Sequence, residues 1–230
     1  MALRAVFLDA GNTLVGLDYE LIAARLRTDG HPVTADLARL AESRARVRLD
    51  PHLAVHRSTE TADVFALYVR YMLDELGISW GEGSDRLVQD FRAANPPFGL
   101  WSTCLPEAPA ALEFLRRLGL RLAVVSNSNG TVARILESLD LARGLDLVVD
   151  SAVVGFEKPD PRIFHYAAAT LGVEPDEAVH VGDLYSVDVK GARAAGSRAI
   201  LLDPVGAWRV DDCPKATDVG AAARLIAKMT

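Results

Sequence analysis

The sequence predicts an α/β protein, in which a doubly wound, mostly parallel sheet carries an inserted all-helical segment. Three observations predict this class. A short apolar run at residues 5–8 ends at Asp9, apolar residues then recur with helical spacing over residues 17–95, and strands alternate with helices from about residue 107. We therefore expect a core domain of residues 1–16 and 98–230, with a helical cap of residues 17–97 over the strand ends where such sheets bind ligands.

The first part of the chain predicts one strand and then helices. Residues 5–8 (AVFL) are apolar throughout, which is typical of a strand buried on both faces. The inserted segment has apolar residues three and four positions apart, as in helices that pack on one face. The predicted helices are residues 19–27, 35–49, 61–77 and 84–94. Residues 95–109 are rich in proline and are predicted to be a connection.

The second part alternates regularly, which predicts strand-helix units and a parallel sheet covered on both faces. The predicted strands are residues 120–127, 145–151, 178–183 and 198–204. The predicted helices are residues 107–119, 131–142, 162–172 and 186–196, with a loop at residues 153–161.

Composition excludes several classes of function. The formal net charge is -6 and the basic residues are scattered, so nucleic acid is not an expected partner. Cys104 and Cys213 are far apart, which argues against a disulfide framework or a zinc site. We expect neither a signal peptide nor a membrane span, because the apolar runs are too short. These features favour a cytoplasmic protein, monomeric or homodimeric, that acts on a small molecule.

Four motifs lie at predicted strand ends or in the loops that follow them. They are "DAGNTL" beginning at Asp9, "VVSNSNG" with Ser126, "GFEKPDPRIF" with Lys158, and "GDLYSVD" with Asp183 and Asp188. The carboxyl ends of parallel strands meet at one edge of a sheet, so these side chains are expected to converge. A carboxylate such as Asp9 can attack phosphorus as a nucleophile. Three converging acids would need a counter-ion, and oxygen ligands favour Mg²⁺.

This set of motifs resembles the haloacid dehalogenase superfamily with a helical cap after the first motif, over residues 6–204. The resemblance implies a hydrolase in which Asp9 forms an aspartyl phosphate and Asp9, Asp183, Asp188 and the Gly11 carbonyl bind Mg²⁺. It implies that Ser126 and Lys158 contact the phosphoryl group. Asn127 and Asn12 would assist in substrate binding, and Thr13 would hold the loop by a hydrogen bond. Alternatively, Asp188 begins a helix for dipole reasons alone and Lys158 is a solvated loop lysine.

Gly11 is the main departure from the family pattern. Phosphatases of the family carry a second Asp there, which protonates the leaving group and then activates water. General acid-base help of this kind is typically worth about 100-fold to 10,000-fold, so an alkyl phosphate would react slowly and an acyl or aryl phosphate less so. Asn12 stands where the family usually has Gly. Among the residues other than Gly, Asn is the one that best tolerates a left-handed backbone conformation. A cap residue could replace the missing acid, and the candidates are Asp18, Glu20, His31, His52 and His56.

Other branches and classes remain as alternatives. Phosphonate hydrolases use a cap lysine, and residues 15–105 contain none. A 2-haloacid dehalogenase would attack carbon without a metal, but two acids beside Asp9 would repel a carboxylate substrate. A phosphate-binding or regulatory module without turnover is the third possibility. His180, on the strand before Asp183, is expected to be a packed residue.

Overall fold

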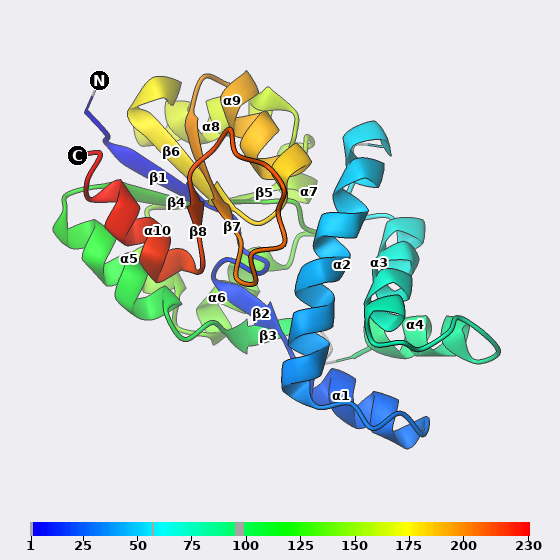
Figure 1. The fold of residues 1–230 in the computed structure, drawn as a ribbon. Helices are drawn as coiled ribbons and strands as arrows, with labels where there is room; N and C mark the ends of the chain where they lie inside the picture. Colours follow the sequence, from blue (N-terminus) through cyan, green and yellow to red (C-terminus); the bar gives the residue numbers. More distant parts are fainter. Residues whose placement is uncertain (1, 57, 95–98) are drawn as a thin grey trace.

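The computed structural model describes residues 2–56, 58–94 and 99–230. Its main sheet has the strand order β5-β4-β1-β6-β7-β8, and all neighbouring pairs are parallel (Figure 1). Helices cover both faces, so the predicted doubly wound α/β class is confirmed. The strands are β1 Ala5–Leu8, β4 Arg121–Ser126, β5 Leu147–Asp150, β6 Ala178–Gly182, β7 Arg198–Leu202 and β8 Lys215–Ala216.

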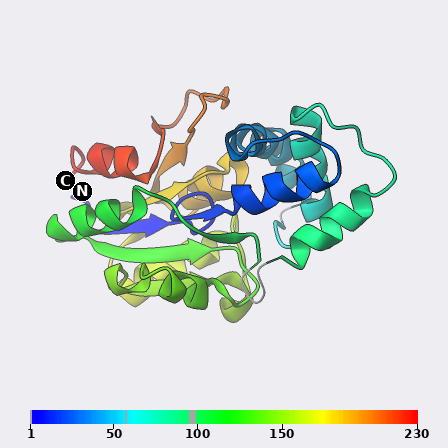
Figure 2. The same ribbon diagram turned by 90° about the horizontal axis from the view of Figure 1, so that it is seen from below.

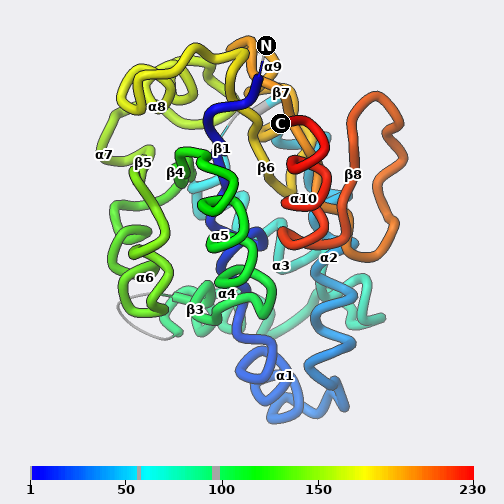
Figure 3. Tube along the Cα trace, turned by 90° about the vertical axis from the view of Figure 1, so that its left-hand side faces the viewer, coloured from blue at the N-terminus to red at the C-terminus, as the bar shows by residue number. Residues whose placement is uncertain are grey.

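The buried central strand β1 separates two hydrophobic layers. Val6 and Leu8 pack towards α5 (Ala108–Arg117), α6 (Val132–Ser138) and α10 (Val219–Ile226). Figure 3 shows α5 and α10 side by side on this face. Phe7 packs towards α8 (Pro161–Leu171) and α9 (Lys190–Ala194) on the other face. Successive side chains of a strand point to opposite faces, so one short apolar run contributes to both layers.

The inserted helices form a separate hydrophobic cluster beyond the carboxyl ends of the strands, as Figure 2 shows. Their bounds are α1 Tyr19–Thr28, α2 Ala35–His56, α3 Ala62–Glu75 and α4 Ser84–Arg92. The cap is expected to span residues 17–97, and its second boundary falls outside the described residues. None of the described helices is both long and apolar enough to cross a membrane.

The structure corrects the prediction for the connection that returns from the helices. Trp101–Cys104 forms β3, which pairs in antiparallel fashion with β2, Val15–Leu17. Both strands are too short for a period of two to be visible in the sequence. This two-stranded ribbon joins the inserted helices to the core. The segment that leaves the core and the segment that returns to it are therefore hydrogen-bonded to each other.

Other differences are local. Helix α2 continues through Pro51 to His56, beyond its predicted end, because burial of Leu53 offsets the loss of one backbone hydrogen bond. The predicted helix at residues 186–196 begins with a π-helical turn, Tyr185–Val189. A short helix α7, Ser151–Val154, replaces the end of the predicted strand and the first two residues of the expected loop, and Asp150 caps it by accepting a hydrogen bond from the Ala152 amide. Short 3-10 turns occur at Ala142–Gly144 and Pro175–Glu177.

Candidate active site

Three neighbouring strands deliver polar residues to one edge of the sheet. Asp9 follows β1, Ser126 ends β4 and Asp183 follows β6, and β1 lies between β4 and β6. All three side chains are buried and line one cavity. The expectation that these motifs converge is therefore met by the topology alone, because parallel strands end at the same edge.

Lys158 is a buried cation between two acids. Its Nζ donates to Asp9 Oδ1 at 2.5 Å and to Asp188 Oδ1 at 2.8 Å, and the residue is only 2% exposed. The side chain of Asn127 holds this lysine in place. Its Oδ1 accepts from the Lys158 amide at 2.7 Å, and its Nδ2 donates to the Lys158 carbonyl at 2.9 Å. Lys158 is thus no solvated loop residue. The Asn127 amide, predicted to assist the substrate, is occupied with this backbone.

Asp188 is held entirely by donors from the protein. Its Oδ1 accepts from Lys158 and contacts His180 Nε2 at 2.8 Å, while its Oδ2 accepts from the backbone amides of Asp183 and Leu184. The π-helical turn brings it against Gly182, where a Cβ would lie 2.2 Å from Asp188 Cγ. Only glycine can occupy that position. The "GD" of the fourth motif therefore has a packing reason for its first residue.

Burial and neighbouring charges shift the pKa values of this cluster. Burial raises the pKa of Asp9 to about 7, against the attraction of Lys158 and with the repulsion of Asp188. Burial acts to raise the pKa of Asp188, but Lys158 and a hydrogen bond from His180 hold it well below its ordinary value. Burial opposes the charge of Lys158, yet Asp188 and Asp9 raise its pKa above its ordinary value. Lys158 and Asp188 are therefore a firmly charged pair beside an Asp9 that exchanges protons readily.

His180 is a packed residue, as predicted. It is fully buried, and its ring lies edge-on to Phe164 at 5.0 Å between centroids. Burial lowers the pKa of His180, so the ring is neutral at pH 7 and its Nε2 proton points to Asp188. This contact limits how the Asp188 carboxylate can turn.

A polar network from the inserted helices reaches Asp183. Arg46 on α2 donates from Nη1 to Asp183 Oδ2 at 2.7 Å, and its Nε lies 2.7 Å from Glu42 Oε1. Glu42 is fully buried and accepts hydrogen bonds from the hydroxyls of Tyr19 and Tyr68. Burial raises the pKa of Asp183, and Arg46 opposes that shift.

Sequence reasoning missed Arg46 and Glu42. The one available signal was their spacing of four residues on a predicted helix, which is usually a solvated ion pair. Nothing in the local pattern shows that α2 turns this pair inward against Asp183. The contact joins residues 137 positions apart, and only the packing of the cap on the core creates it.

The loop after Asp9 differs in part from expectation. Asn12 has a φ of +54°, so the predicted left-handed backbone is confirmed. Its side chain lines the cavity and donates to Asp183 Oδ2 at 3.2 Å, and its role in substrate binding stays a prediction. Thr13 is fully buried, and its hydroxyl has no hydrogen-bond partner within the part of the chain that the structure describes. The hydroxyl therefore does not hold the loop. The Thr13 amide does, because it donates to the Ala10 carbonyl at 3.4 Å, together with the amides of Leu14 and Val15.

Two carboxylate oxygens of the site are open to a metal ion. Across residues 2–56, 58–94 and 99–230, no three His, Cys, Asp or Glu side chains form a ready metal cluster. Both oxygens of Asp188 contact protein groups, and its role as a metal ligand stays a prediction. Asp9 Oδ2 and Asp183 Oδ1 accept no hydrogen bond from any described residue. Mg²⁺ is commonly held by one or two carboxylates with water and substrate phosphate, which these two oxygens and the Gly11 carbonyl could provide.

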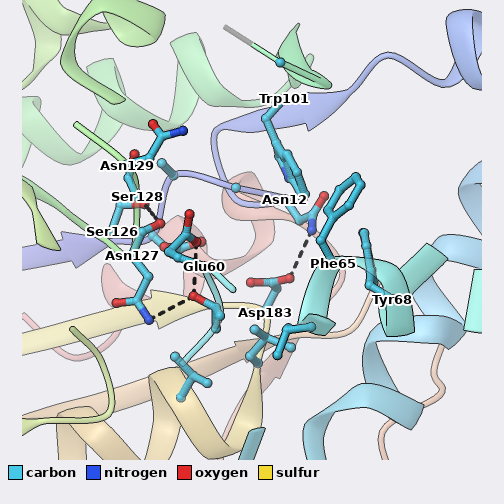
Figure 4. A pocket seen from close by; sticks show the side chains of 18 of the residues that line it. Asn12, Glu60, Phe65, Tyr68, Trp101, Ser126, Asn127, Ser128, Asn129 and Asp183 are labelled. Atoms are coloured by element: carbon cyan, nitrogen blue, oxygen red, sulfur yellow. Dashed lines mark hydrogen bonds between the residues drawn. The ribbon is translucent and has the colours of Figure 1, made fainter. Parts of the chain in front are cut away.

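The cavity above these residues is polar at one end and apolar at the other. Its volume is about 430 Å³. Ser126, Ser128 and Asn129 lie on the core side, and Phe65, Tyr68 and Trp101 lie across from them (Figure 4). Further apolar residues line it, namely Leu49, Leu53, Val64, Phe91, Leu100, Val132 and Ile135. The space thus suits a small anion attached to an apolar group.

Four of the five residues proposed to replace the missing acid do not line the cavity. Asp18 caps α1 through the Leu21 amide, and neither it nor Glu20, His31 or His52 lines the cavity. The side chain of His56 lies outside the described residues. Glu60, which the sequence did not single out, lines the cavity from the loop before α3. That loop is fixed to the core because Asn127 Nδ2 donates to Thr59 Oγ1 at 3.1 Å.

Comparison with known proteins agrees with this geometry. A model of haloacid dehalogenase-like hydrolases matches residues 3–196. Haloacid dehalogenase-like hydrolase domain-containing protein 3 of Xenopus laevis is 31% identical over 217 residues, covering 89% of this chain and 86% of that protein. The protein of the same name from Bos taurus is 41% identical over 119 residues, and the match spans 52% of this chain and 45% of that protein. A phosphoserine phosphatase of Thermus thermophilus is 46% identical over 99 residues, which span 43% and 40% of the two chains.

A solved structure shares the fold along the whole chain. The putative hydrolase YfnB of Bacillus subtilis, solved with bound magnesium, has a TM-score of 0.69 and 19% identity and covers 98% of this chain and 99% of its own. The fold, the converged motifs and the extent of the family match all indicate the same family. The chain belongs to the family of haloacid dehalogenase-like hydrolases.

Proposed function

We propose that this hydrolase cleaves small phosphate monoesters through an aspartyl phosphate formed on Asp9, with Mg²⁺ as cofactor. The observation that carries the proposal is Lys158, which is buried and bonded at once to Asp9 and Asp188. It places a fixed positive charge where a phosphoryl group would meet the nucleophile. The phosphoserine phosphatase among the relatives supports the reaction class.

Each polar residue around Asp9 has its own role in the proposed reaction. Asp9 attacks phosphorus with its unbonded Oδ2, while Lys158 holds the other oxygen and fixes the orientation of the carboxylate. Ser126, at the end of β4, lies in the cavity and can donate its hydroxyl to a phosphoryl oxygen. Asp188 and Asn127 hold Lys158 from its ammonium and its backbone. Bound Mg²⁺ would neutralise charge on the phosphoryl oxygens.

The missing second acid limits the substrates. Gly11 has no side chain that can protonate a leaving group, and the Asn12 amide is turned to Asp183. We therefore expect acyl and aryl phosphates to react faster than alkyl phosphates, whose leaving groups need a proton.

The test is phosphate release from acetyl phosphate with and without Mg²⁺, comparing the native chain with Asp9→Asn. Turnover that requires the metal and disappears in Asp9→Asn supports the proposal. The substitution keeps the size of the side chain, and a thermal melt confirms folding. Equal turnover by both proteins would reject Asp9 as nucleophile.

One observation favours a second candidate, a 2-haloacid dehalogenase. Arg46 and Lys158 already supply two positive charges to the three acids, so the repulsion of a carboxylate substrate is smaller than the sequence suggests. Halide release from 2-chloropropionate without added metal would establish this activity. The absence of halide from a panel of 2-haloacids would reject it.

A further inference from the structure

The apolar end of the cavity is an aromatic wall, formed by Phe65, Tyr68 and Trp101. The ring of Trp101 stacks on that of Tyr68 at 6.2 Å between centroids and is tilted to that of Phe65 at 6.4 Å. Tyr68 is fixed by its hydroxyl bond to Glu42, and Arg92 lies 6.0 Å from the centre of the Phe65 ring. The wall is therefore held on the side of the cavity opposite Ser126, Ser128 and Asn129 (Figure 4), and Asp9 lines the same cavity.

Trp101 also lies beside the loop that follows the nucleophile. A Cβ built on Gly11 would lie 3.2 Å from Trp101 Nε1 and 3.8 Å from Asp9 Oδ2. The indole N–H and the free oxygen of Asp9 thus lie within 4 Å of one point on the loop. A side chain at position 11 would crowd the indole, which would have to shift by a few tenths of an ångström. An indole donates a hydrogen bond but cannot give up its proton at neutral pH.

We infer that the substrate is a phosphate monoester of an aryl or similarly planar, apolar alcohol, and that Trp101 binds its leaving-group oxygen. The inference rests on the proposed phosphatase function and deepens it. With phosphorus at Asp9 Oδ2, the ester oxygen on the opposite side faces the cavity. The apolar body of the alcohol then lies against the aromatic wall, and the Trp101 N–H donates to the oxygen that accumulates charge.

The step balances without a general acid. Asp9 Oδ2 forms a bond to phosphorus, the bond from phosphorus to the ester oxygen breaks, and its electron pair leaves with that oxygen. The product is an aryloxide, stabilised by the indole N–H, which takes a proton from a water molecule and leaves hydroxide. A second water molecule then attacks the aspartyl phosphate, and the proton that it releases neutralises this hydroxide. One water molecule is consumed in total, and a leaving group of low pKa is required.

Glu60 is the competing explanation for the missing acid. It lines the same cavity, and burial raises the pKa of its carboxyl above its ordinary value, but it stands on a loop that is attached to Asn127. Trp101 lies beside the loop that carries Asp9. The position of the two groups favours Trp101 as the partner of the leaving oxygen.

The first experiment measures binding and needs no turnover. Calorimetric titration compares phenylphosphonate with methylphosphonate, two stable analogues that differ only in the apolar group. We expect phenylphosphonate to bind at least tenfold more tightly than methylphosphonate, because an aryl ring gains affinity by packing on aromatic side chains. Phe65→Ala should reduce that ratio, whereas Phe114→Ala, an exposed phenylalanine on α5, should leave it unchanged. Equal affinities for the two analogues in the native protein would overturn the inference.

The second experiment separates the N–H from the ring. Trp101→Phe keeps an aromatic surface and loses the donor, and its folding is checked by a thermal melt. We expect kcat/KM for phenyl phosphate to fall about 100-fold. The loss should be smaller for p-nitrophenyl phosphate and least for acetyl phosphate. The kcat/KM of Trp101→Phe should therefore depend more steeply on the pKa of the leaving group than the kcat/KM of the native chain does. An unchanged dependence would overturn the role of Trp101.

Two controls complete the design. Glu60→Gln should change the rate for phenyl phosphate less than twofold. A large loss in Glu60→Gln, with loss of a limb of the pH profile, would identify Glu60 as the acid and overturn the inference. Turnover of acetyl phosphate without a preference for phenylphosphonate rejects the substrate class alone. If neither acetyl phosphate nor any aryl phosphate is hydrolysed, the proposed function and the substrate class both fail.

Discussion

Lys158 balances the charge of two buried acids in this site, Asp9 and Asp188. Replacing it by Met keeps a chain of similar length but leaves Asp9 and Asp188 without their cation. Breaking a buried ion pair from one side typically costs about 3–5 kcal/mol. We therefore expect Lys158→Met to lose turnover and to lower the free energy of unfolding by this amount, as measured in urea.

The double variant Lys158→Met with Asp188→Asn is the matched control. It removes the charge of Asp188, one of the two buried carboxylates that lose their cation in Lys158→Met. Part of the lost stability should therefore return, while turnover should not. If the single variant were as stable as the native chain, the Lys158 ion pairs would not have the geometry described here.

Gly11 yields a second prediction at this scale. From the sequence alone, Gly11→Asp is expected to restore the general acid and with it the turnover of alkyl phosphates. In the structure, however, the new Cβ would lie 3.2 Å from the Trp101 indole. The single variant should therefore gain no turnover of alkyl phosphates, because the carboxyl and the indole compete for one space. Gly11→Asp combined with Trp101→Ala should gain it, measured as kcat/KM for a simple alkyl phosphate. A rescue by the single variant would contradict the packing of Trp101.

Single residues show where sequence reasoning succeeds. Asp9, Ser126 and Asp183 are placed correctly because a rule of topology brings strand ends together. The partners of Asn12, Asn127 and Thr13 are not predictable in this way, since each depends on which distant group lies within hydrogen-bond reach. Motif residues therefore arrive at the right location, whereas their individual bonds need the three-dimensional packing.

At the scale of elements, helix α2 is attached to the π-helical turn by Asp50. Its carboxylate accepts from the amide and the hydroxyl of Ser186, each at 2.7 Å. Burial raises the pKa of Asp50 above its ordinary value, although Ser186 and Lys190 oppose the shift and Asp188 supports it. A raised pKa means that the charged form of Asp50 costs stability at neutral pH.

The sign of this linkage gives a prediction for Asp50→Asn. An amide can accept from the Ser186 amide and donate to its hydroxyl without a charge, so the variant should be at least as stable as the native chain at pH 7. Its advantage should shrink as the pH falls through the raised pKa of Asp50 and vanish below the ordinary value of 3.8. Asp50→Ala should instead cost about 1–3 kcal/mol, because a buried donor loses its partner. Urea unfolding at pH 7 and pH 4 distinguishes these outcomes.

Elements with a long periodic pattern were predicted best. The inserted helices and the central strands follow from apolar spacing, but the ribbon of β2 and β3 did not. Strands of three or four residues do not reveal a period, and their stability comes from pairing with each other. The position of Trp101 beside Gly11 depends on that ribbon. The feature that constrains the leaving group was therefore invisible in the sequence.

At the scale of the whole molecule, the core and the inserted helices meet at a charged contact. The ion pair of Arg46 with Asp183 joins α2 to the end of β6. Asp183 is also one of the two acids that fit Mg²⁺. A guanidinium and a divalent cation both seek the same carboxylate, so the contact between the helices and the core should be coupled to metal binding.

This coupling can be measured with Arg46→Gln. Removal of a positive charge next to Asp183 should increase the affinity for Mg²⁺, on the order of tenfold for a partly buried charge at this separation. Arg48→Gln is a close control, because Arg48 lies on the same helix and pairs with Asp74 and Glu75 on the exposed side. It should leave the affinity unchanged in a calorimetric titration. If both variants bound Mg²⁺ equally, Arg46 would not compete with the metal. If Arg46→Gln bound more weakly, the guanidinium would be a partner of the metal site, and the helices would close over the metal instead of yielding to it.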